Sequence, residues 1–224
     1  MTYPMRLRLL LFLLPLSAIA ATPLMDELTP GDAASEAKHQ VQAVNSEEMR
    51  GAMHQPARRL LPGDLVKIDV TAECDGYIAD GARTVALPPV SQRAARLRDA
   101  ARRAFERGAA SARPGALVSA IGREVEQSVR SEGFSVIRAL SGHGVGRTIH
   151  EAPTVPNYFD HRQKDVLTEG LVITIEPLIS ERPCRVVEDA DGWTLRAANC
   201  ALAAHFEETI VVTNGAPLVL TKAA

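Results

Sequence analysis

Residues 65–87 read LVKIDVTAECDGYIADGARTVAL, and this stretch decides the fold. Apolar and polar side chains alternate from Leu65 to Thr71, which is the pattern of a strand with one buried face. The pair Asp75-Gly76 follows, and a second strand-like run continues to Leu87. Because Asp-Gly favours a two-residue turn between antiparallel strands, the stretch predicts a β-hairpin.

The predicted hairpin places two carboxylates on one face. With Asp75-Gly76 as the turn residues, Asp69 opposes Ala82 and Asp80 opposes Thr71, so the two aspartates are diagonal neighbours. For a single aspartate, a solvated strand position is the ordinary alternative. Two acids side by side repel each other, and an unpaired carboxylate that faces a core is costly. A metal ion between them would remove that cost.

Two helices and several later strands are predicted beyond the hairpin. Apolar residues recur at helical spacing in residues 91–112 and 117–131. Strand patterns lie mostly before and after this block of helices. We therefore predict an α+β fold with a largely antiparallel sheet, and not a doubly wound one. No glycine signature of a nucleotide-binding loop opens either helix.

The composition is typical of one soluble domain of catalytic size. The chain has 224 residues, 46% of them hydrophobic, and a formal net charge of -2. Because neither sign of charge dominates, nucleic acid and anionic membrane surfaces are not expected as partners. A small or peptidic ligand fits this composition better.

The N-terminus has the outline of a signal peptide. Two arginines, Arg6 and Arg8, precede an apolar stretch that ends in the small-x-small pattern Ala18-Ile19-Ala20. We therefore expect a signal peptide at residues 1–21 and a periplasmic or secreted protein. The stretch is too short for a stable membrane anchor. The alternative is a cytoplasmic protein whose leucine-rich start is not a true signal.

Four further side chains are candidates for metal chemistry. His143 lies in an expected glycine-rich loop, SGHGVGRTIH, with His150 seven residues later. Glu176 ends an apolar run, and Glu207 begins the last long strand pattern. Singly, each glutamate could be an edge-strand charge that discourages aggregation. Together with the two aspartates, the glutamates and one imidazole suit one or two ions of manganese, iron, cobalt or zinc.

Five motifs, in order, resemble those of type I methionine aminopeptidases. They are DVTAECDGYIADGARTVAL from Asp69, SGHGVGRTIHEAPTVPNY from Ser141, GLVITIEPLI from Gly170, DGWTLRA from Asp191 and HFEETIVVT from His205. The resemblance covers about Arg58 to Thr221, and the DGWT segment favours this family over its prolidase and creatinase relatives. It implies a pita-bread fold, in which two pseudo-symmetric halves hold the metal ions between them.

The resemblance also implies a role for each candidate residue. In such a site, Asp69 chelates one of two divalent ions, Asp80 and Glu207 bridge both, and His143 with Glu176 completes the second. Glu176 would also relay the proton of the attacking hydroxide. His150 resembles the substrate-side histidine that donates a hydrogen bond to the peptide.

The substrate pocket departs from the family pattern. Trp193 corresponds to a tryptophan that lines the methionine pocket, although a single core tryptophan is an equal alternative. Ile149 stands where the family usually has an aromatic residue, and His205 stands where a glutamine is usual. These differences concern selectivity and not the metal ligands.

The first half of the family fold is expected to be shortened here. We divide the chain into the signal peptide, residues 22–57 as a remnant of that half or a linker, and residues 58–224 as the catalytic domain. The remnant resembles the segment that bears a second histidine, and either Arg50 or His54 takes its place. An exposed sheet edge would result unless the chain forms a homodimer.

The sequence therefore predicts a metal-dependent aminopeptidase that acts on N-terminal methionine in peptides or proteins. Two alternatives remain open. One is a degenerate paralogue that binds metal or peptide N-termini without turnover. The other is a related enzyme such as an X-Pro peptidase.

Overall fold

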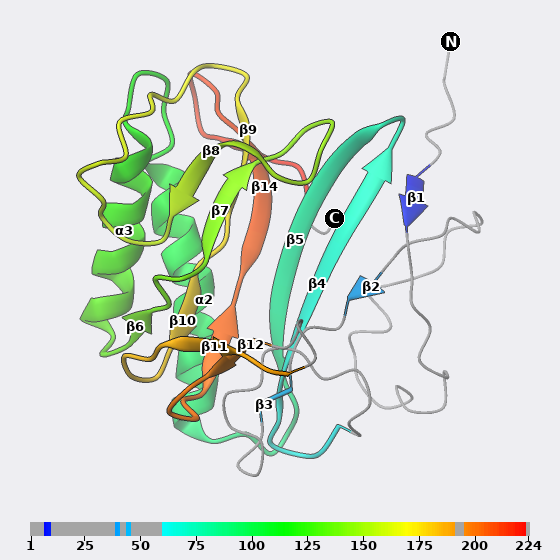
Figure 1. The fold of residues 1–224 in the computed structure, drawn as a ribbon, viewed down its shortest axis with the longest axis vertical. Coiled ribbons are helices and arrows are strands. Elements are labelled where there is room, and N and C mark those ends of the chain that lie inside the picture. The colour runs from blue at the N-terminus through cyan, green and yellow to red at the C-terminus, as the bar shows by residue number, and fades with distance from the viewer. Residues whose placement is uncertain (1–6, 10–38, 41–43, 46–59, 191–194, 223–224) are drawn as a thin grey trace.

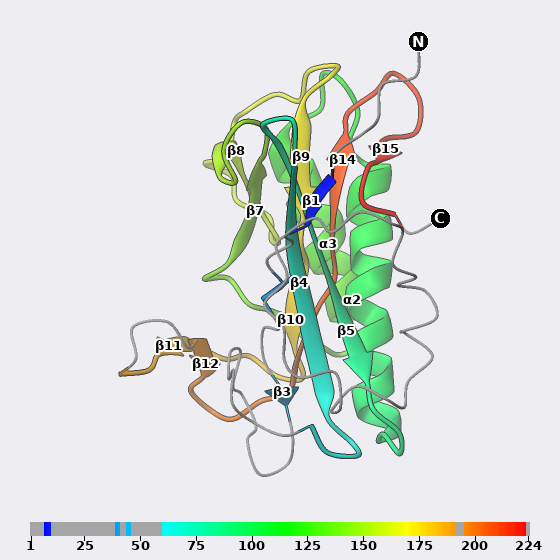
Figure 2. The ribbon, with the colours of Figure 1, turned by 90° about the vertical axis from the view of Figure 1, so that its right-hand side faces the viewer.

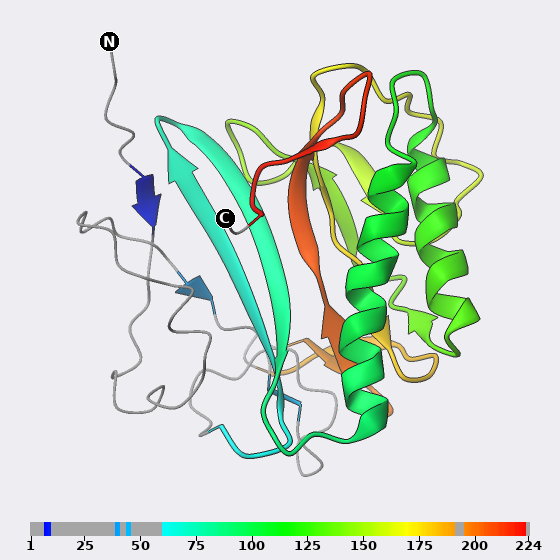
Figure 3. The same ribbon diagram turned by 180° about the vertical axis from the view of Figure 1, so that it is seen from behind.

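The computed structural model describes residues 7–9, 39–40, 44–45, 60–190 and 195–222. Its main feature is one curved antiparallel sheet whose strands run along the long axis of the molecule (Figure 1). Two helices cover one face of this sheet (Figures 2 and 3). The other face has no described helix over it, and this open face carries the polar side chains discussed below.

The predicted hairpin is confirmed in position and register. Strand β4 (Leu65–Cys74) pairs antiparallel with β5 (Tyr77–Ala86). Asp69 lies opposite Ala82, and Thr71 lies opposite Asp80, as the turn position predicts. The turn residues Asp75 and Gly76 have positive φ angles of 53° and 78°. A turn of this hand matches the twist of the strands that it joins.

The sheet has ten strands, and every pairing among the described strands is antiparallel. Its main path runs β1-β4-β5-β14-β9-β7-β8, with β2 and β3 on β4 and β15 on β14. The additional strands are β1 (Leu7–Leu9), β2 (His39–Gln40), β3 (Val44–Asn45), β7 (Ser141–Gly144), β8 (Glu151–Pro156), β9 (Val172–Ile175), β14 (Glu207–Val211) and β15 (Leu218–Val219). The sheet therefore brings strands from both ends of the catalytic region side by side.

Two smaller sheets lie at one end of the molecule (Figure 1). They are built by β13 (Ala203–His205), β10 (Leu178–Ser180) and β6 (Ser135–Val136), and by β11 (Val186–Glu188) with β12 (Leu195–Ala197). The first of these sheets places His205 at the open face, and one residue, Phe206, separates it from the start of β14.

Helices α2 (Gln92–Ala110) and α3 (Val118–Ser131) pack against the sheet and against each other. The Ser91 side chain accepts a hydrogen bond from the Ala94 amide, which caps the first helix. The helices approach closely at Gly108, where an added Cβ would lie 2.7 Å from a methyl group of Val125. A larger residue would therefore push the two helices apart.

The hydrophobic core fills the space between the helices and the sheet. Its fully buried members include Leu97, Ile121, Ile173, Ile175 and Ile210. Burying each such side chain contributes about 1.5–3 kcal/mol. The core thus fixes one face of β9 and β14, and by alternation it fixes which residues of these strands face the other way.

One local expectation was wrong, because His143 lies in strand β7 and not in a loop. The glycines on either side of it allow this. An added Cβ at Gly142 would lie 2.5 Å from the Thr174 carbonyl oxygen, and one at Gly144 would lie 2.2 Å from that of Ala152. The glycines therefore serve close contact between backbones rather than a flexible turn.

The predicted α+β class with a mostly antiparallel sheet is confirmed. The segments assigned to a signal peptide and a remnant first half lie outside the described residues, except for the strands β1, β2 and β3. Those assignments stay predictions. Among the described helices, none is long and apolar enough to span a membrane.

Candidate metal centre

The open face of the sheet carries two overlapping groups of metal-binding side chains. One group is Asp69, His205 and Glu207, and the other is Asp80, His143 and Glu207. Within each group, one ligand atom from every residue lies within 4.8 Å of the others. Glu207 belongs to both groups. We call the first the Asp69 group and the second the Asp80 group.

The register of the sheet explains why three of these residues meet. Ala82 pairs with Asp69 on one side and with Glu207 on the other, so the three residues form a row across β4, β5 and β14. Residues in such a row point to the same face of a sheet. Because the central residue is an alanine, the two carboxylates have room between them.

Asp80 is held in place by several hydrogen bonds. Its Oδ1 atom accepts from the Thr71 hydroxyl and from the Gly81 amide, both at 3.1 Å. Its backbone amide donates to the Thr209 hydroxyl, which donates in turn to its carbonyl oxygen, each at 2.8 Å. This links β5 to β14 beside the shared glutamate and fixes the direction of the carboxylate.

His143 presents one ring nitrogen to the acids. Its Nδ1 atom lies 2.9 Å from the Gly144 carbonyl oxygen. Because a carbonyl can only accept, Nδ1 carries the proton, and in a neutral ring Nε2 is left with a free lone pair. Nε2 lies 3.6 Å from Oε1 of Glu176. This is the ring orientation that a metal-binding histidine needs.

Glu176 completes the arrangement from the end of β9. The Thr174 hydroxyl accepts a hydrogen bond from the His143 amide at 3.1 Å and donates to Glu176 at 3.4 Å. One Glu176 oxygen also lies 3.9 Å from Nε2 of His205. Since Ile173 and Ile175 point into the core, Thr174 and Glu176 point to the open face.

Burial is the main reason that the acids of the site resist ionisation. Burial, together with the nearby carboxylate of Asp80, raises the pKa of Asp69 to about 8. Burial also raises the pKa of Asp80, and it raises the pKa of Glu176 and Glu207 well above the usual value, with neighbouring acids adding to the effect. A divalent cation would reverse these shifts by favouring the charged carboxylates.

The sequence did not predict His205 as part of the metal centre. We call the whole set of converging side chains the cage, and its members are Asp69, Asp80, His143, Glu176, His205 and Glu207. Burial, with the charges of Lys67 and Arg83, lowers the pKa of His205 to about 3, so its ring is neutral. Its Nε2 atom lies 3.5 Å from Oε2 of Glu207. Among the described residues, Nε2 of His205 and Oε1 of Glu207 are buried without a hydrogen-bond partner. Two neighbouring side chains that each bury an unpaired ligand atom are suited to bind a metal ion.

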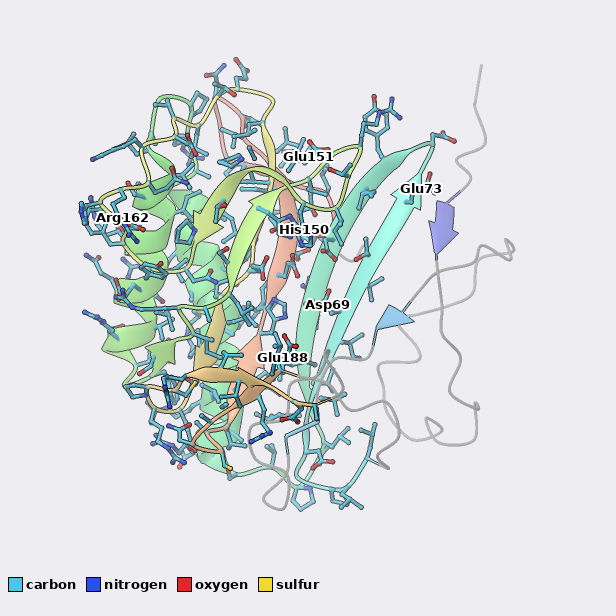
Figure 4. The ribbon with its side chains drawn as sticks, in the orientation of Figure 1. Asp69, Glu73, His150, Glu151, Arg162 and Glu188 are labelled. Carbon is cyan, nitrogen blue, oxygen red and sulfur yellow. The ribbon has the colours of Figure 1, made fainter. Side chains whose placement is uncertain are left out.

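The predicted ligands therefore converge, whereas the predicted substrate-binding residues are only partly described. His150 is exposed, and its ring lies edge-on to the His143 ring with 4.4 Å between centroids. Figure 4 shows Asp69 on β4 and His150 on the same open face of the sheet. Ile149 is half-buried beside His150. Trp193, and the alternatives Arg50 and His54, lie outside the described residues.

An open sheet face that gathers four carboxylates and two imidazoles offers the ligand types that divalent metal ions in hydrolases use. Comparison with known proteins defines the class further. The sequence matches the metallopeptidase family M24 over residues 27–214. The chain belongs to this family of metal-dependent enzymes that hydrolyse peptide bonds.

Within the family, the similarity is to methionine aminopeptidases. The chain is 39% identical over 181 residues to methionine aminopeptidase 2 of Bacillus subtilis, covering 80% of this chain and 72% of that one. The crystal structure of methionine aminopeptidase from Thermotoga maritima matches with a TM-score of 0.76 at 34% identity, covering 83% of this chain and 75% of that one. A prolidase from Pyrococcus furiosus matches with a TM-score of 0.60 at 27% identity, covering 75% of this chain and 44% of that one. The predicted resemblance and the pita-bread fold are thereby confirmed.

Proposed function

We propose that the chain is an aminopeptidase that removes N-terminal methionine from peptides, using two divalent ions held by the Asp69 and Asp80 groups. The observation that carries the proposal is Glu207, which takes part in both groups and can bridge two ions. When bound, such ions activate water and polarise the first peptide carbonyl. The ligand roles of Asp69, Asp80, His143, Glu176 and Glu207 follow this proposal.

Glu176 is proposed to accept the proton of the attacking water. Its carboxyl group lies within reach of both histidines of the cage, and burial raises its pKa well above the usual value. A carboxylate beside the bound water is suited to accept its proton and then release it. The Thr174 hydroxyl donates to one of its oxygens and so holds the group in place.

His150 is proposed to contact the substrate from the rim of the cage. Its exposed ring lies directly against His143, so a peptide carbonyl near the metal ligands would come within its reach. A donor at that position stabilises the negative charge that develops on the carbonyl oxygen. Ile149, Trp193 and His54 are proposed to shape the pocket for the first side chain.

The preference for methionine over an X-Pro substrate rests on the comparisons. The matching methionine aminopeptidase has a higher TM-score than the matching prolidase, 0.76 against 0.60, and higher sequence identity. The chain also covers 75% of that methionine aminopeptidase and 44% of that prolidase. Both comparisons favour a methionyl substrate.

The test is peptide hydrolysis by protein with a measured metal content. Metal-free protein reloaded with manganese or cobalt is expected to release methionine from a Met-Ala-Ser peptide, and to leave an Ala-Pro-Ser peptide largely intact. Asp80→Ala should abolish the release, while Asp99→Ala, a change in a half-exposed ion pair of α2, should not. Absence of methionine release while metal analysis shows bound ions would overturn the proposal.

A further inference from the structure

The residue proposed to contact the substrate, His150, lies on a short loop. Residues 145–150 connect β7 to β8, and we call them the His150 loop. The loop leaves the sheet at Gly144 and re-enters it at Glu151, and these two residues pair with each other. His150 is the last residue of the loop, and it is exposed. Because no strand contains it, its position depends on the contacts that hold the loop.

The backbone of the His150 loop is tied to the β4–β5 hairpin. In Figures 1 and 3 the loop reaches from β7 and β8 toward the turn between β4 and β5. The amide of Ile78, the second residue of β5, donates to the Gly146 carbonyl oxygen at 2.8 Å. The loop therefore meets the same hairpin that carries Asp69 and Asp80.

The Arg147 side chain adds a second link to this hairpin. Its guanidinium carbon lies 3.7 Å from the centroid of the Tyr77 ring. Its Nη1 atom donates to the carbonyl oxygens of both turn residues, Asp75 and Gly76, at 3.2 Å each. An added Cβ at Gly76 would lie 2.7 Å from Nη1, so the glycine leaves room for this contact. Arg147 thus stacks on the ring with its flat face and bonds to the turn with its edge.

Hydrogen bonds within the loop connect Arg147 to His150. The Glu151 carboxylate accepts from the Thr148 amide at 2.8 Å. The Thr148 hydroxyl lies 3.3 Å from the His150 carbonyl oxygen, to which it can donate. These bonds make the segment from Arg147 to Glu151 compact. We therefore expect a change at Arg147 to move His150 as well.

The His150 ring lies edge-on to the His143 ring, with 4.4 Å between centroids. His143 belongs to the Asp80 group and is fixed in β7. The ring contact alone leaves an exposed loop residue free to turn away from the sheet. The hairpin therefore acts on the site in two ways: it carries the two aspartates itself, and it supports His150 through the loop.

We propose that Arg147 is a positioning residue: by stacking on Tyr77 and bonding to the turn at Asp75 and Gly76, it holds the His150 loop against the hairpin and keeps the His150 ring beside His143. This inference rests on the proposed function, in which His150 contacts the substrate. It assigns to Arg147 an effect on the rate of hydrolysis without any contact with the metal ions.

The first test compares kcat with KM for release of methionine from a Met-Ala-Ser peptide by manganese-loaded protein. Arg147→Met should lower kcat about tenfold and change KM less than about threefold, because a misplaced donor loses contact mainly with the transition state. Tyr77→Leu removes the other half of the stack and should lower kcat by a smaller factor. Arg123→Met is the matched control, because Arg123 stacks on Phe159 at 4.5 Å from α3, outside the ligand groups. It should leave both constants unchanged.

The second test asks whether Arg147 acts through His150. In a His150→Ala background, Arg147→Met should cause no further loss of kcat. A full additional loss in the double variant would overturn the assignment, because Arg147 would then act by another route. Loss of manganese binding in Arg147→Met, measured by calorimetry, would overturn it as well, since the arginine would then support the metal ligands.

The third test needs no activity. In metal-free protein, NMR should detect magnetisation transfer between the His143 and His150 rings in the wild type and in Arg123→Met, and should show its loss in Arg147→Met. Retention of the ring contact together with an unchanged kcat in Arg147→Met would overturn the assignment and leave the proposed function standing. Wild type that binds manganese but releases no methionine would overturn the proposed function, and the NMR comparison would still decide whether Arg147 holds the ring in place.

Discussion

The two faces of the main sheet are built from alternate residues of the same strands, yet they have opposite energetic character. In β9, Ile173 and Ile175 are fully buried against the helices, whereas Thr174, and Glu176 just after the strand, face the open side. The helix side gains free energy from apolar burial. The open side carries acids whose ionisation is opposed by burial, and further by one another, until a cation binds between them. Neighbouring residues of one strand therefore serve different purposes: one stabilises the core and the next faces the candidate metal centre.

Removing Glu207, the acid shared by the two groups, should have the largest effect on function of the changes considered. Glu207→Gln takes one charged ligand from both groups. We expect methionine release to fall at least about a hundredfold and metal affinity to fall about 10–100-fold, by analogy with the loss of metal ligands and their partners. Metal analysis and peptide assays measure the two effects. Without metal, the variant should be no less stable than the wild type, and a clear loss of stability would contradict the comparison.

A cavity on the helix side should have the reverse effect. Ile173→Ala removes a fully buried side chain and should lower the free energy of unfolding by about 2–5 kcal/mol. The residual folded protein should bind metal with nearly wild-type affinity. Denaturant unfolding followed by circular dichroism gives the first quantity, and calorimetry gives the second. A large loss of metal affinity in folded protein would show that the two faces are coupled.

The acids should also make the metal-free protein sensitive to pH. The pKa of Asp69 is 3.8 without perturbation and about 8 in the folded chain, so the folded state binds more protons between these values. The free energy of unfolding should therefore fall as the pH rises through this window. His205, whose pKa is lowered from 6.5 to about 3, acts in the opposite direction below 6.5.

The clean interval for this measurement is thus between pH 6.5 and about 8. Thermal unfolding of the metal-free protein across that interval should show a falling midpoint, and the slope should be shallower in Asp69→Asn. Added manganese should remove most of the slope, because bound metal keeps the acids charged. A midpoint that rises with pH in the absence of metal would contradict the prediction.

The smallest effect on metal binding is expected from Arg83, which contacts the backbone of Glu207 and is not itself a ligand. Its guanidinium donates to the carbonyl oxygens of Glu207 at 2.7 Å and Ala82 at 2.9 Å, and it lies 4.1 Å from the Phe206 ring centroid. It also forms an ion pair with Glu208. Arg83→Met should weaken metal binding about tenfold by loosening the backbone of Glu207.

The control for this change is Arg93→Met, which removes an arginine that pairs with Glu181 at 3.1 Å outside the two ligand groups. It should affect stability to a similar degree and leave the metal titration unchanged. Equal metal affinities in the two variants would mean that the Arg83 contacts do not position the shared acid.

The sequence predicted those parts of the site that depend on local pattern. The Asp-Gly turn fixed the register of β4 and β5, and with it the shared face of Asp69 and Asp80. It could not show that Ala82 would also pair with Glu207, because that pairing joins segments far apart in the chain. The motif resemblance, and not the residue pattern, brought the remaining ligands together.

The missed features have a common physical cause. His143 was expected in a loop, because glycines usually favour turns, but here they allow neighbouring backbones to approach closely. His205 was assigned to the substrate pocket because it stands where the family usually has a glutamine, and that role stays a prediction. Its place beside Asp69 and Glu207 could not be predicted, because its strand β13 has only three residues and no alternating pattern to reveal its direction. Short strands are defined by tertiary contacts, which periodicity cannot show.

The small size of the Ala82 side chain is itself important for the metal centre. It is 1% exposed and stands between the two acids of the row across β4, β5 and β14. A single methyl group therefore sets the free volume between Asp69 and Glu207. Valine or leucine at this position would keep every ligand of the site and still fill the space that an ion requires. A chain of this family could lose its metal through one apolar substitution.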